Sequence, residues 1–276
     1  MSEEQLKSVM ESLHRLPALP SVVMEVIDSF AETGISTTLL ADKISRDQAL
    51  SAKLLQVSNS SFYGLSRQVG SINEAVMVLG FDSVRTLTVA IGLIHGLSPF
   101  TDQLLNRKRF WQYNIQVATC ARFLAKSLNF NSEIAFTAGL LHDIGQMALA
   151  LTYPERYGLI VEHNQGPGLI ESEQQEFGFD HAMLGAEVAR HWNFPLAIQD
   201  AIKYHHDMDS VDISVLSGII YIANFLHEQF RTFKTEEEIV SEFPSELYSK
   251  LNLNEKIIVS AIAILNRSDI GAQFLE

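Results

Sequence analysis

Five residues in the second half of the chain have side chains of the kind that bind metals. A histidine–aspartate pair, His142 and Asp143, stands inside an apolar run over residues 139–145, and three later histidines follow it: His181, His205 and His206. Imidazole nitrogens and carboxylate oxygens hold divalent transition metals, which lower the pKa of bound water and neutralise phosphate charge. These five residues are therefore the candidate ligand set of a metal-dependent phosphohydrolase site.

Each of these residues also has a structural interpretation. His142 and Asp143 suit a buried hydrogen-bonded pair that ties helices together, because a buried charge needs a partner. Asp180 is placed to cap a helix that begins at His181. His205 and His206 are expected to close a helix, where the helix dipole favours histidine. The residues by themselves leave both interpretations open.

The apolar run predicts a helix that carries both His142 and Asp143. Neighbours on a helix diverge by about 100 degrees, so Asp143 is expected to reach across the site and bridge. Gly139 and Gly145 are expected to relieve crowding around that turn of helix. His181 and the later histidines would arrive from separate helices to close the cleft.

Composition and charge narrow the function classes. The chain has 276 residues, 47% of them hydrophobic, which is enough to bury a sizeable core. Its net charge of −13 disfavours nucleic acid and anionic membranes as partners, since no large positive field is present. A single cysteine, Cys120, fits a reducing compartment. The N-terminus has no signal pattern, and uncharged runs such as residues 86–101 and 213–226 fall short of the ~20 apolar residues that a spanning helix needs, so we expect a cytoplasmic protein with no membrane partner.

Helical periodicity runs through the sequence and strand signals are nearly absent, which predicts an all-α fold. We expect an N-terminal helical bundle over residues 1–100, packed against a second helical bundle over residues 101–232. A C-terminal helical extension would cover residues 233–276. The boundary between the bundles is expected near Ser98-Pro99. Helix starts are marked by side chains suited to capping, at Ser36, Asp47, Ser71, Asn131 and Asp180.

The order of several motifs along the chain resembles the HDOD family, a degenerate branch of the HD phosphohydrolase superfamily. The first half contains LPALP at residues 16–20, LLQVSNSSFY at 54–63 and SINEAV at 71–76. The second half contains Phe110-Trp111, LLHDIG at 140–145, His181 with Gly185-Ala186, and YHH at 204–206. The resemblance places the HDOD domain at residues 12–212. It implies an HD-like helical bundle in the second half, with the five candidate residues around a divalent transition metal.

The resemblance also implies two ligands that this chain lacks. The superfamily's first histidine falls at Tyr113, and its final aspartate falls at Asn224. Tyrosine is a poor ligand for a hard divalent ion at neutral pH, and asparagine carries no charge. The signature of the HD-GYP phosphodiesterases is missing as well, with Asp207 where those enzymes have glutamate. We therefore expect a two-metal site to be severely weakened.

These departures favour a non-enzymatic bacterial signal-transduction regulator that acts through protein contacts. Without a receiver, cyclase or phosphodiesterase domain, the chain is expected to dock signalling proteins in trans. Two alternatives stay open: a metal-dependent phosphohydrolase or phosphodiesterase with a reduced ligand set, and a module that senses a nucleotide in the old cleft. The sequence leaves open the partner, the signal, the metal, the oligomeric state and whether Tyr113 and Asn224 line the cleft.

Overall fold

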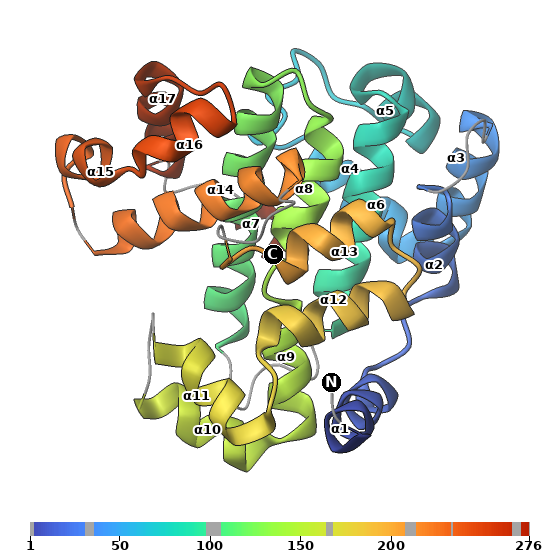
Figure 1. Cartoon of the computed structure of the whole chain (residues 1–276). Helices are drawn as coiled ribbons and strands as arrows, with labels where there is room; N and C mark the ends of the chain where they lie inside the picture. Colours follow the sequence, from blue (N-terminus) through green and yellow to red (C-terminus); the bar gives the residue numbers. More distant parts are fainter. Residues whose placement is uncertain are drawn as a thin grey trace.

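The chain folds into helices and turns, with no strand among the residues whose structure is described (Figure 1). The all-α prediction is therefore confirmed. The predicted boundary at Ser98-Pro99 lies outside the described residues. The computed structural model describes residues 3–30, 36–97, 106–163, 168–207, 214–232, 234–266 and 272–275.

The first half of the chain contributes a bundle of five helices around α6, which is buried over most of its length. Three of these helices begin where capping was predicted. Ser36, Asp47 and Ser71 each accept a hydrogen bond from a backbone N–H three positions further on. The bounds are α2 Ser21–Asp28, α3 Thr37–Arg46, α4 Gln48–Ser58, α5 Ile72–Leu79 and α6 Phe81–Leu97.

The second half forms the helices that position the candidate site. The helices α7 and α8 pack along each other at the centre of the molecule, and α12 packs against both α9 and α13 (Figure 1). Asn131 and Asp180 cap α8 and α12 as predicted. The bounds are α7 Arg107–Ser127, α8 Ser132–Leu141, α9 Ile144–Thr152, α10 Pro154–His163, α11 Gly168–Phe177, α12 His181–His191, α13 Leu196–Lys203 and α14 Val215–Arg231.

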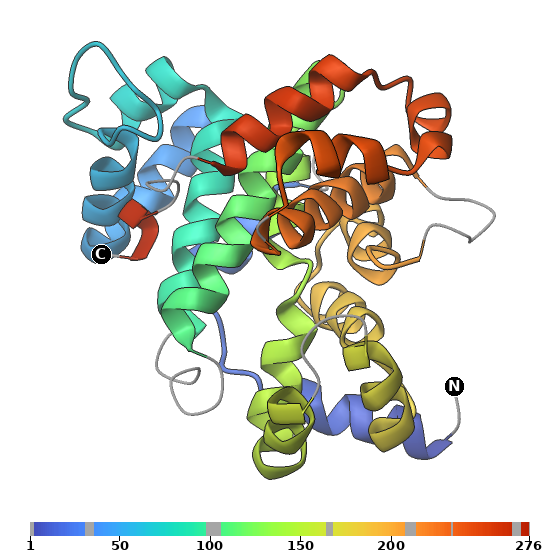
Figure 2. The same ribbon diagram turned by 90° about the vertical axis from the view of Figure 1, so that its left-hand side faces the viewer.

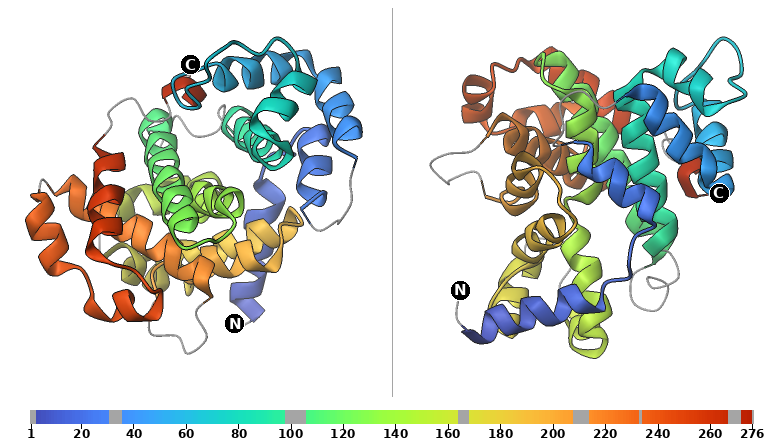
Figure 3. Two further views of the ribbon diagram at one scale, coloured as in Figure 1. Left: turned by 90° about the horizontal axis from the view of Figure 1, so that it is seen from above. Right: turned by 90° about the vertical axis from the view of Figure 1, so that its right-hand side faces the viewer.

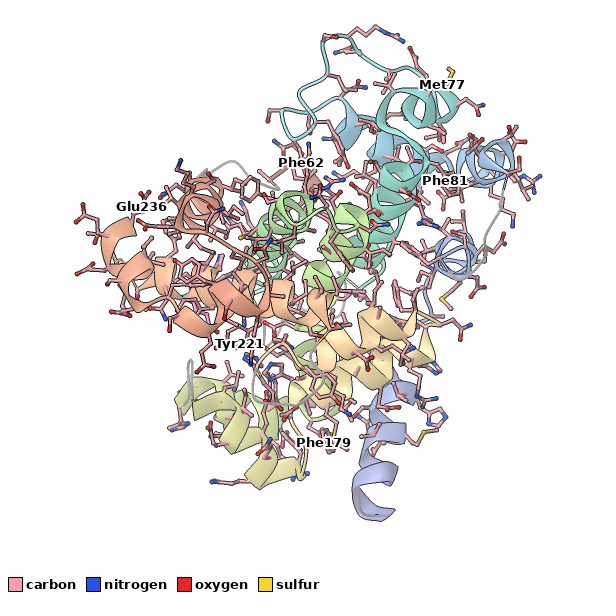
Figure 4. The ribbon with its side chains drawn as sticks, turned by 45° about the horizontal axis from the view of Figure 1, so that its top comes forward. Phe62, Met77, Phe81, Phe179, Tyr221 and Glu236 are labelled. Carbon is pink, nitrogen blue, oxygen red and sulfur yellow. The ribbon has the colours of Figure 1, made fainter. Side chains whose placement is uncertain are left out.

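Each end of the chain packs against helices from the opposite half of the sequence. Helix α1, Glu3–Arg15, packs on α9 and α12 and lies away from the other N-terminal helices (Figure 3). Three C-terminal helices lie beside α14: α15 Glu236–Glu242, α16 Ser245–Lys250 and α17 Glu255–Leu265. The last helix, α18 Ala272–Leu275, packs against α4 and α6 in the N-terminal half (Figure 2). There the ring of Phe274 meets that of Phe62, with centroids 5.3 Å apart (Phe62 is labelled in Figure 4).

The segment Ser132–Thr152, which spans α8 and α9, is long and apolar enough to cross a membrane by length and composition alone. In its most apolar window, 83% of the residues are buried inside the fold. Burial of this extent is that of a core segment. The same segment carries the His142–Asp143 pair, so the candidate site is built from the centre of the protein.

The prediction of one helix through His142 and Asp143 is wrong. Helix α8 ends at Leu141 and α9 begins at Ile144, so the pair forms a turn between them. The backbone of Asp143 leaves helical geometry, with φ −100° and ψ 12°. Helix α13 likewise ends at Lys203, before the two histidines that were expected to close it. Residues at such turns can turn their side chains toward a common point, which a regular helix does not allow at adjacent positions.

Candidate metal centre

Asp143 lies at the centre of a cluster of imidazole rings. Its Oδ1 atom is 3.3 Å from Nε2 of His181 and 3.5 Å from Nε2 of His205, and its Oδ2 atom is 3.6 Å from Nε2 of His142. The Nε2 atoms of His181 and His206 are 3.0 Å apart. Ligand atoms of Asp143, His181, His205 and His206 all lie within 4.8 Å of one another. The structure thus brings four of the five candidate residues into one site, with His142 beside it.

Two glycines allow the helices that carry these side chains to approach closely. A Cβ atom on Gly145 would lie 1.9 Å from the carbonyl oxygen of His181 and 2.7 Å from the backbone nitrogen of Gly185. A Cβ atom on Gly139 would lie 2.7 Å from Cα of Ala118 on α7. Both glycines relieve crowding as predicted. The contact at Gly145 places α9 directly against α12, and so brings the aspartate to the histidine at the start of α12.

Carbonyl groups orient two of the histidines. Nδ1 of His142 is 2.7 Å from the carbonyl oxygen of Gly139, and Nδ1 of His205 is 2.6 Å from that of Ile202. A carbonyl only accepts, so each Nδ1 carries the hydrogen and donates it. The Nε2 atoms are the ones left to face Asp143. Metal-binding histidines are commonly held in this way.

A buried carboxylate that the sequence did not single out, Glu173, orients the third histidine. Its Oε2 atom accepts hydrogen bonds from the backbone N–H of His181 at 2.8 Å and from Nδ1 of the same residue at 2.7 Å. Its Oε1 atom accepts from the hydroxyl of Tyr157 at 3.1 Å. Helix α11 is rich in Glu and Gln, so composition hides this residue. Its position four residues before the buried Phe177, on the same helix face, is the signal that could have found it.

The charges in the cluster stabilise one another. Burial alone would raise the pKa of Asp143, but the neighbouring imidazoles outweigh burial and hold this pKa well below its usual range. Burial alone would lower the pKa of His181, but Glu173 and Asp143 raise it to about 10. Burial prevails at His142 and lowers its pKa to about 4, and burial together with nearby imidazoles lowers the pKa of His206. At neutral pH His181 is therefore cationic, with its two ring nitrogens directed at Glu173 and at Asp143.

The donor set fits one transition-metal ion. Three imidazoles and one carboxylate suit zinc and related metals. Four tetrahedral ligands that stand 2.0–2.1 Å from such an ion are ~3.3–3.4 Å from one another. Three of the donor-atom separations in this cluster, 3.0 Å, 3.3 Å and 3.5 Å, are close to that spacing, and all four donor atoms lie within 4.8 Å of one another. Nε2 of His205 is buried and has no hydrogen-bond partner among the described residues. A buried nitrogen of this kind, facing a carboxylate, is suited to a cation.

Tyr113 and Asn224 line the same site. The Tyr113 hydroxyl donates a hydrogen bond to Oδ1 of Asn224 and lies 3.5 Å from Nε2 of His142. The Tyr113 ring also packs edge-on against His227, with centroids 4.6 Å apart. Burial and the nearby Asp143 raise the pKa of Tyr113 well above its usual range, so it remains a neutral phenol. On this side of the cluster two neutral side chains bind each other.

An all-α fold in which a His–Asp turn faces one histidine at the start of α12 and two histidines in the turn after α13 defines an HD-type helical protein. The chain belongs to the HDOD family, whose HDOD domain matches residues 16–208. Two solved structures are similar over nearly the whole chain. A provisionally named phosphohydrolase of Shewanella amazonensis is 25% identical, with 94% of each chain covered and a TM-score of 0.80. An HDOD domain protein of Geobacter sulfurreducens, of unknown function, is 23% identical, with 96% and 98% covered and a TM-score of 0.79.

Curated relatives share parts of the chain. An uncharacterized protein of Treponema pallidum is 28% identical over 207 residues, which are 73% of this chain and 39% of that protein. Ribonuclease Y of Thermus thermophilus is 30% identical over 125 residues, which are 42% of this chain and 17% of the ribonuclease. The chain therefore spans well under half the length of either relative.

Proposed function

We propose that this HDOD protein is a non-enzymatic bacterial signal-transduction regulator that acts through contacts with other proteins. The hydrogen bond between Tyr113 and Asn224 carries the proposal, because the superfamily resemblance puts a histidine and an aspartate at these positions. Two-metal phosphohydrolases use both ions to stabilise the attacking and leaving oxygens. With a neutral pair in place, a second ion would find only Nε2 of His142 and Oδ2 of Asp143, which is too few ligands to retain it.

In this proposal the Asp–His cluster holds a single divalent transition-metal ion. Asp143, His181, His205 and His206 would be its ligands, and the ion would join the α8–α9 turn to α12 and to the turn after α13. A bound divalent ion acts as a Lewis acid and lowers the pKa of its water. A dication in place of the His181 proton would balance the two buried carboxylates, Asp143 and Glu173.

Metal analysis and turnover assays test this proposal. We expect one ion per chain and no hydrolysis of phosphomonoesters, phosphodiesters or cyclic dinucleotides. Two ions per chain, with turnover that His142→Ala plus Asp143→Ala abolishes, would contradict it. His163→Ala is the matched control, because His163 is exposed, lies outside the cluster and hydrogen-bonds to the carbonyl of Leu159 in its own helix.

A metal-dependent phosphohydrolase with a reduced ligand set is the second candidate. The unpartnered Nε2 of His205 beside Asp143 favours it, since one ion at this point is enough to activate a water. The similarity to the provisionally named phosphohydrolase of Shewanella amazonensis also supports it. This candidate predicts turnover with one ion per chain, and loss of that turnover in Asp143→Asn.

The proposal also covers the molecules that the protein binds. We propose cytoplasmic signalling proteins that bind in trans, and a nucleotide as a ligand of the old cleft. The net charge of −13 argues against nucleic acid and membrane partners, and the ribonuclease name belongs to relatives of which this chain spans 17%. Thermal-shift measurements with a nucleotide panel test the ligand, because binding to the folded state raises the Tm. An unchanged Tm across the panel would contradict it.

A further inference from the structure

Glu173 is a fully buried carboxylate on α11 that contacts the Asp–His cluster without belonging to its ligand set. Two of the hydrogen bonds it accepts come from His181, and the third comes from the hydroxyl of Tyr157. An isolated buried carboxylate is costly, because it loses its hydration. The hydrogen bonds from His181 and Tyr157 offset this cost, so the carboxylate and the histidine depend on each other in the folded protein.

We propose that Glu173 is a positioning residue of the metal site, which keeps His181 with Nδ1 protonated and Nε2 directed at the ion. The inference rests on the proposed single-ion site. Both the backbone N–H and Nδ1 of His181 donate to the same Oε2 atom, at 2.8 Å and 2.7 Å. A ring held at these two points keeps its Nε2 atom near Asp143, with 3.3 Å between Nε2 and Oδ1.

The place of His181 in the fold explains why another helix must supply this acceptor. His142 and His205 lie just after helices, and their Nδ1 atoms reach a carbonyl three residues back in the preceding turn. His181 is the first residue of α12, so no helical turn precedes it. Its backbone N–H is also among those that a helix leaves without an internal partner. A carboxylate satisfies both the ring and the backbone, and the positive end of the helix dipole favours it.

The charge of Glu173 has a second effect on the ligand. An anion behind an imidazole makes the opposite nitrogen a better donor to a metal, and loss of such partners typically weakens metal binding about 10- to 100-fold. Glutamine has the same shape and can still accept a hydrogen bond, but it carries no charge. Glu173→Gln therefore separates the electrostatic role from the packing role.

Metal binding by the 276-residue chain tests the inference. Metal-free wild type, Glu173→Gln and Glu176→Gln are titrated with Zn²⁺ and with Co²⁺, by calorimetry and by the visible spectrum of bound cobalt. We expect the Kd of Glu173→Gln to rise about 10- to 100-fold, with a changed cobalt spectrum. Glu176 lies on the same helix, is exposed and pairs with Arg156, so Glu176→Gln should match the wild type.

The possible results distinguish the positioning role of Glu173 from the existence of the metal site itself. If wild type and Glu173→Gln bind both ions equally well, the positioning role is overturned and the metal site remains. If wild type binds neither ion, the metal site is overturned and the positioning role with it. If Glu173→Gln does not fold, the inference can still be tested by nitrogen-15 spectra of the wild-type protein alone. Nitrogen-15 spectra of the Zn²⁺-loaded protein should show His181 with Nδ1 protonated and Nε2 bound, and binding through Nδ1 would overturn the inference.

Discussion

The hydroxyl of Tyr113 on α7 donates a hydrogen bond to the side-chain oxygen of Asn224 on α14, 111 residues further along the chain. The bond lies beside His142, at the edge of the Asp–His cluster. Each residue satisfies the other, so neither offers a charged or strongly basic donor to an ion. This relationship separates the site from the two-metal sites of the superfamily that the chain resembles.

The double substitution Tyr113→His plus Asn224→Asp should create a second metal position. It replaces a neutral pair with an imidazole and a carboxylate next to His142, whose pKa of about 4 leaves it neutral and free to bind at pH 7. We expect metal analysis to give two ions per chain where the wild type gives one.

One conservative substitution is the control for this prediction. Tyr113→Phe removes the hydrogen bond without adding a ligand, and should lower the free energy of unfolding by about 1 kcal/mol with no change in bound metal. Unchanged metal content in the double variant, with the fold intact, would show that the two positions do not control the number of ions.

Gly145→Ala should destabilise the protein and weaken metal binding together. The added Cβ would lie 1.9 Å from the carbonyl oxygen of His181, so α9 and α12 must move apart. Overpacking of this kind costs typically 1–3 kcal/mol, and more where backbone must shift. Chemical denaturation measures the loss. Gly96→Ala is the matched control: its Cβ meets Pro20 at an ordinary 3.6 Å, so no destabilisation is expected. Equal stability of the two variants would contradict the close approach.

In the metal-free protein, stability should decrease at alkaline pH because of His181. The pKa of this buried imidazole is raised to about 10 from an ordinary value of 6.5. Its contribution is therefore fully present below pH 6.5 and is lost as pH rises through about 10. The slope should reach up to ~1.4 kcal/mol per pH unit for one proton. Urea unfolding between pH 6.5 and 10 measures it, and His181→Gln should reduce the slope. The same slope in both proteins would contradict the pairing with Glu173.

Acid should destabilise the metal-free protein through the histidines that are buried in neutral form. Burial and Arg231 lower the pKa of His227 to about 3 from its ordinary value of 6.5. Its contribution is present above pH 6.5 and is lost as pH falls through about 3. His227→Gln removes this titration and should shift the acid unfolding midpoint, followed by circular dichroism, to lower pH. The exposed His163→Gln should leave the midpoint unchanged. If both variants unfold at the wild-type pH, His227 does not resist protonation.

The helix starts were accessible from sequence because each depends on residues close together in the chain. Asp47, Asn131 and Asp180 cap their helices through hydrogen bonds to backbone N–H groups two or three residues on. The break between α8 and α9, at which His142 and Asp143 form the turn, could not be predicted from the sequence. Their surroundings in the sequence are apolar and helix-forming, and the side chains that Asp143 faces, His181 at the start of α12 and His205 in the turn after α13, are distant in the chain.

The role of Glu173 could not be predicted from the sequence either. Several Glu and Gln residues occupy α11, and their local patterns are alike. Packing of α11 on α10, together with the hydrogen bonds of Glu173 to His181, accompanies the burial of Glu173, while Glu176 is exposed. That choice depends on Tyr157 and His181, which lie 16 and 8 residues away in the chain.

The sequence alone determined the all-α fold, the family and the residue types of the site, because helical periodicity, caps and short motifs are local properties of the chain. The tertiary structure decided which of those residues meet. It placed Asp143 among the imidazoles, Glu173 behind His181, and Tyr113 against Asn224. Contacts of this kind depend on how distant helices pack, and side-chain packing is determined only when the whole core is assembled.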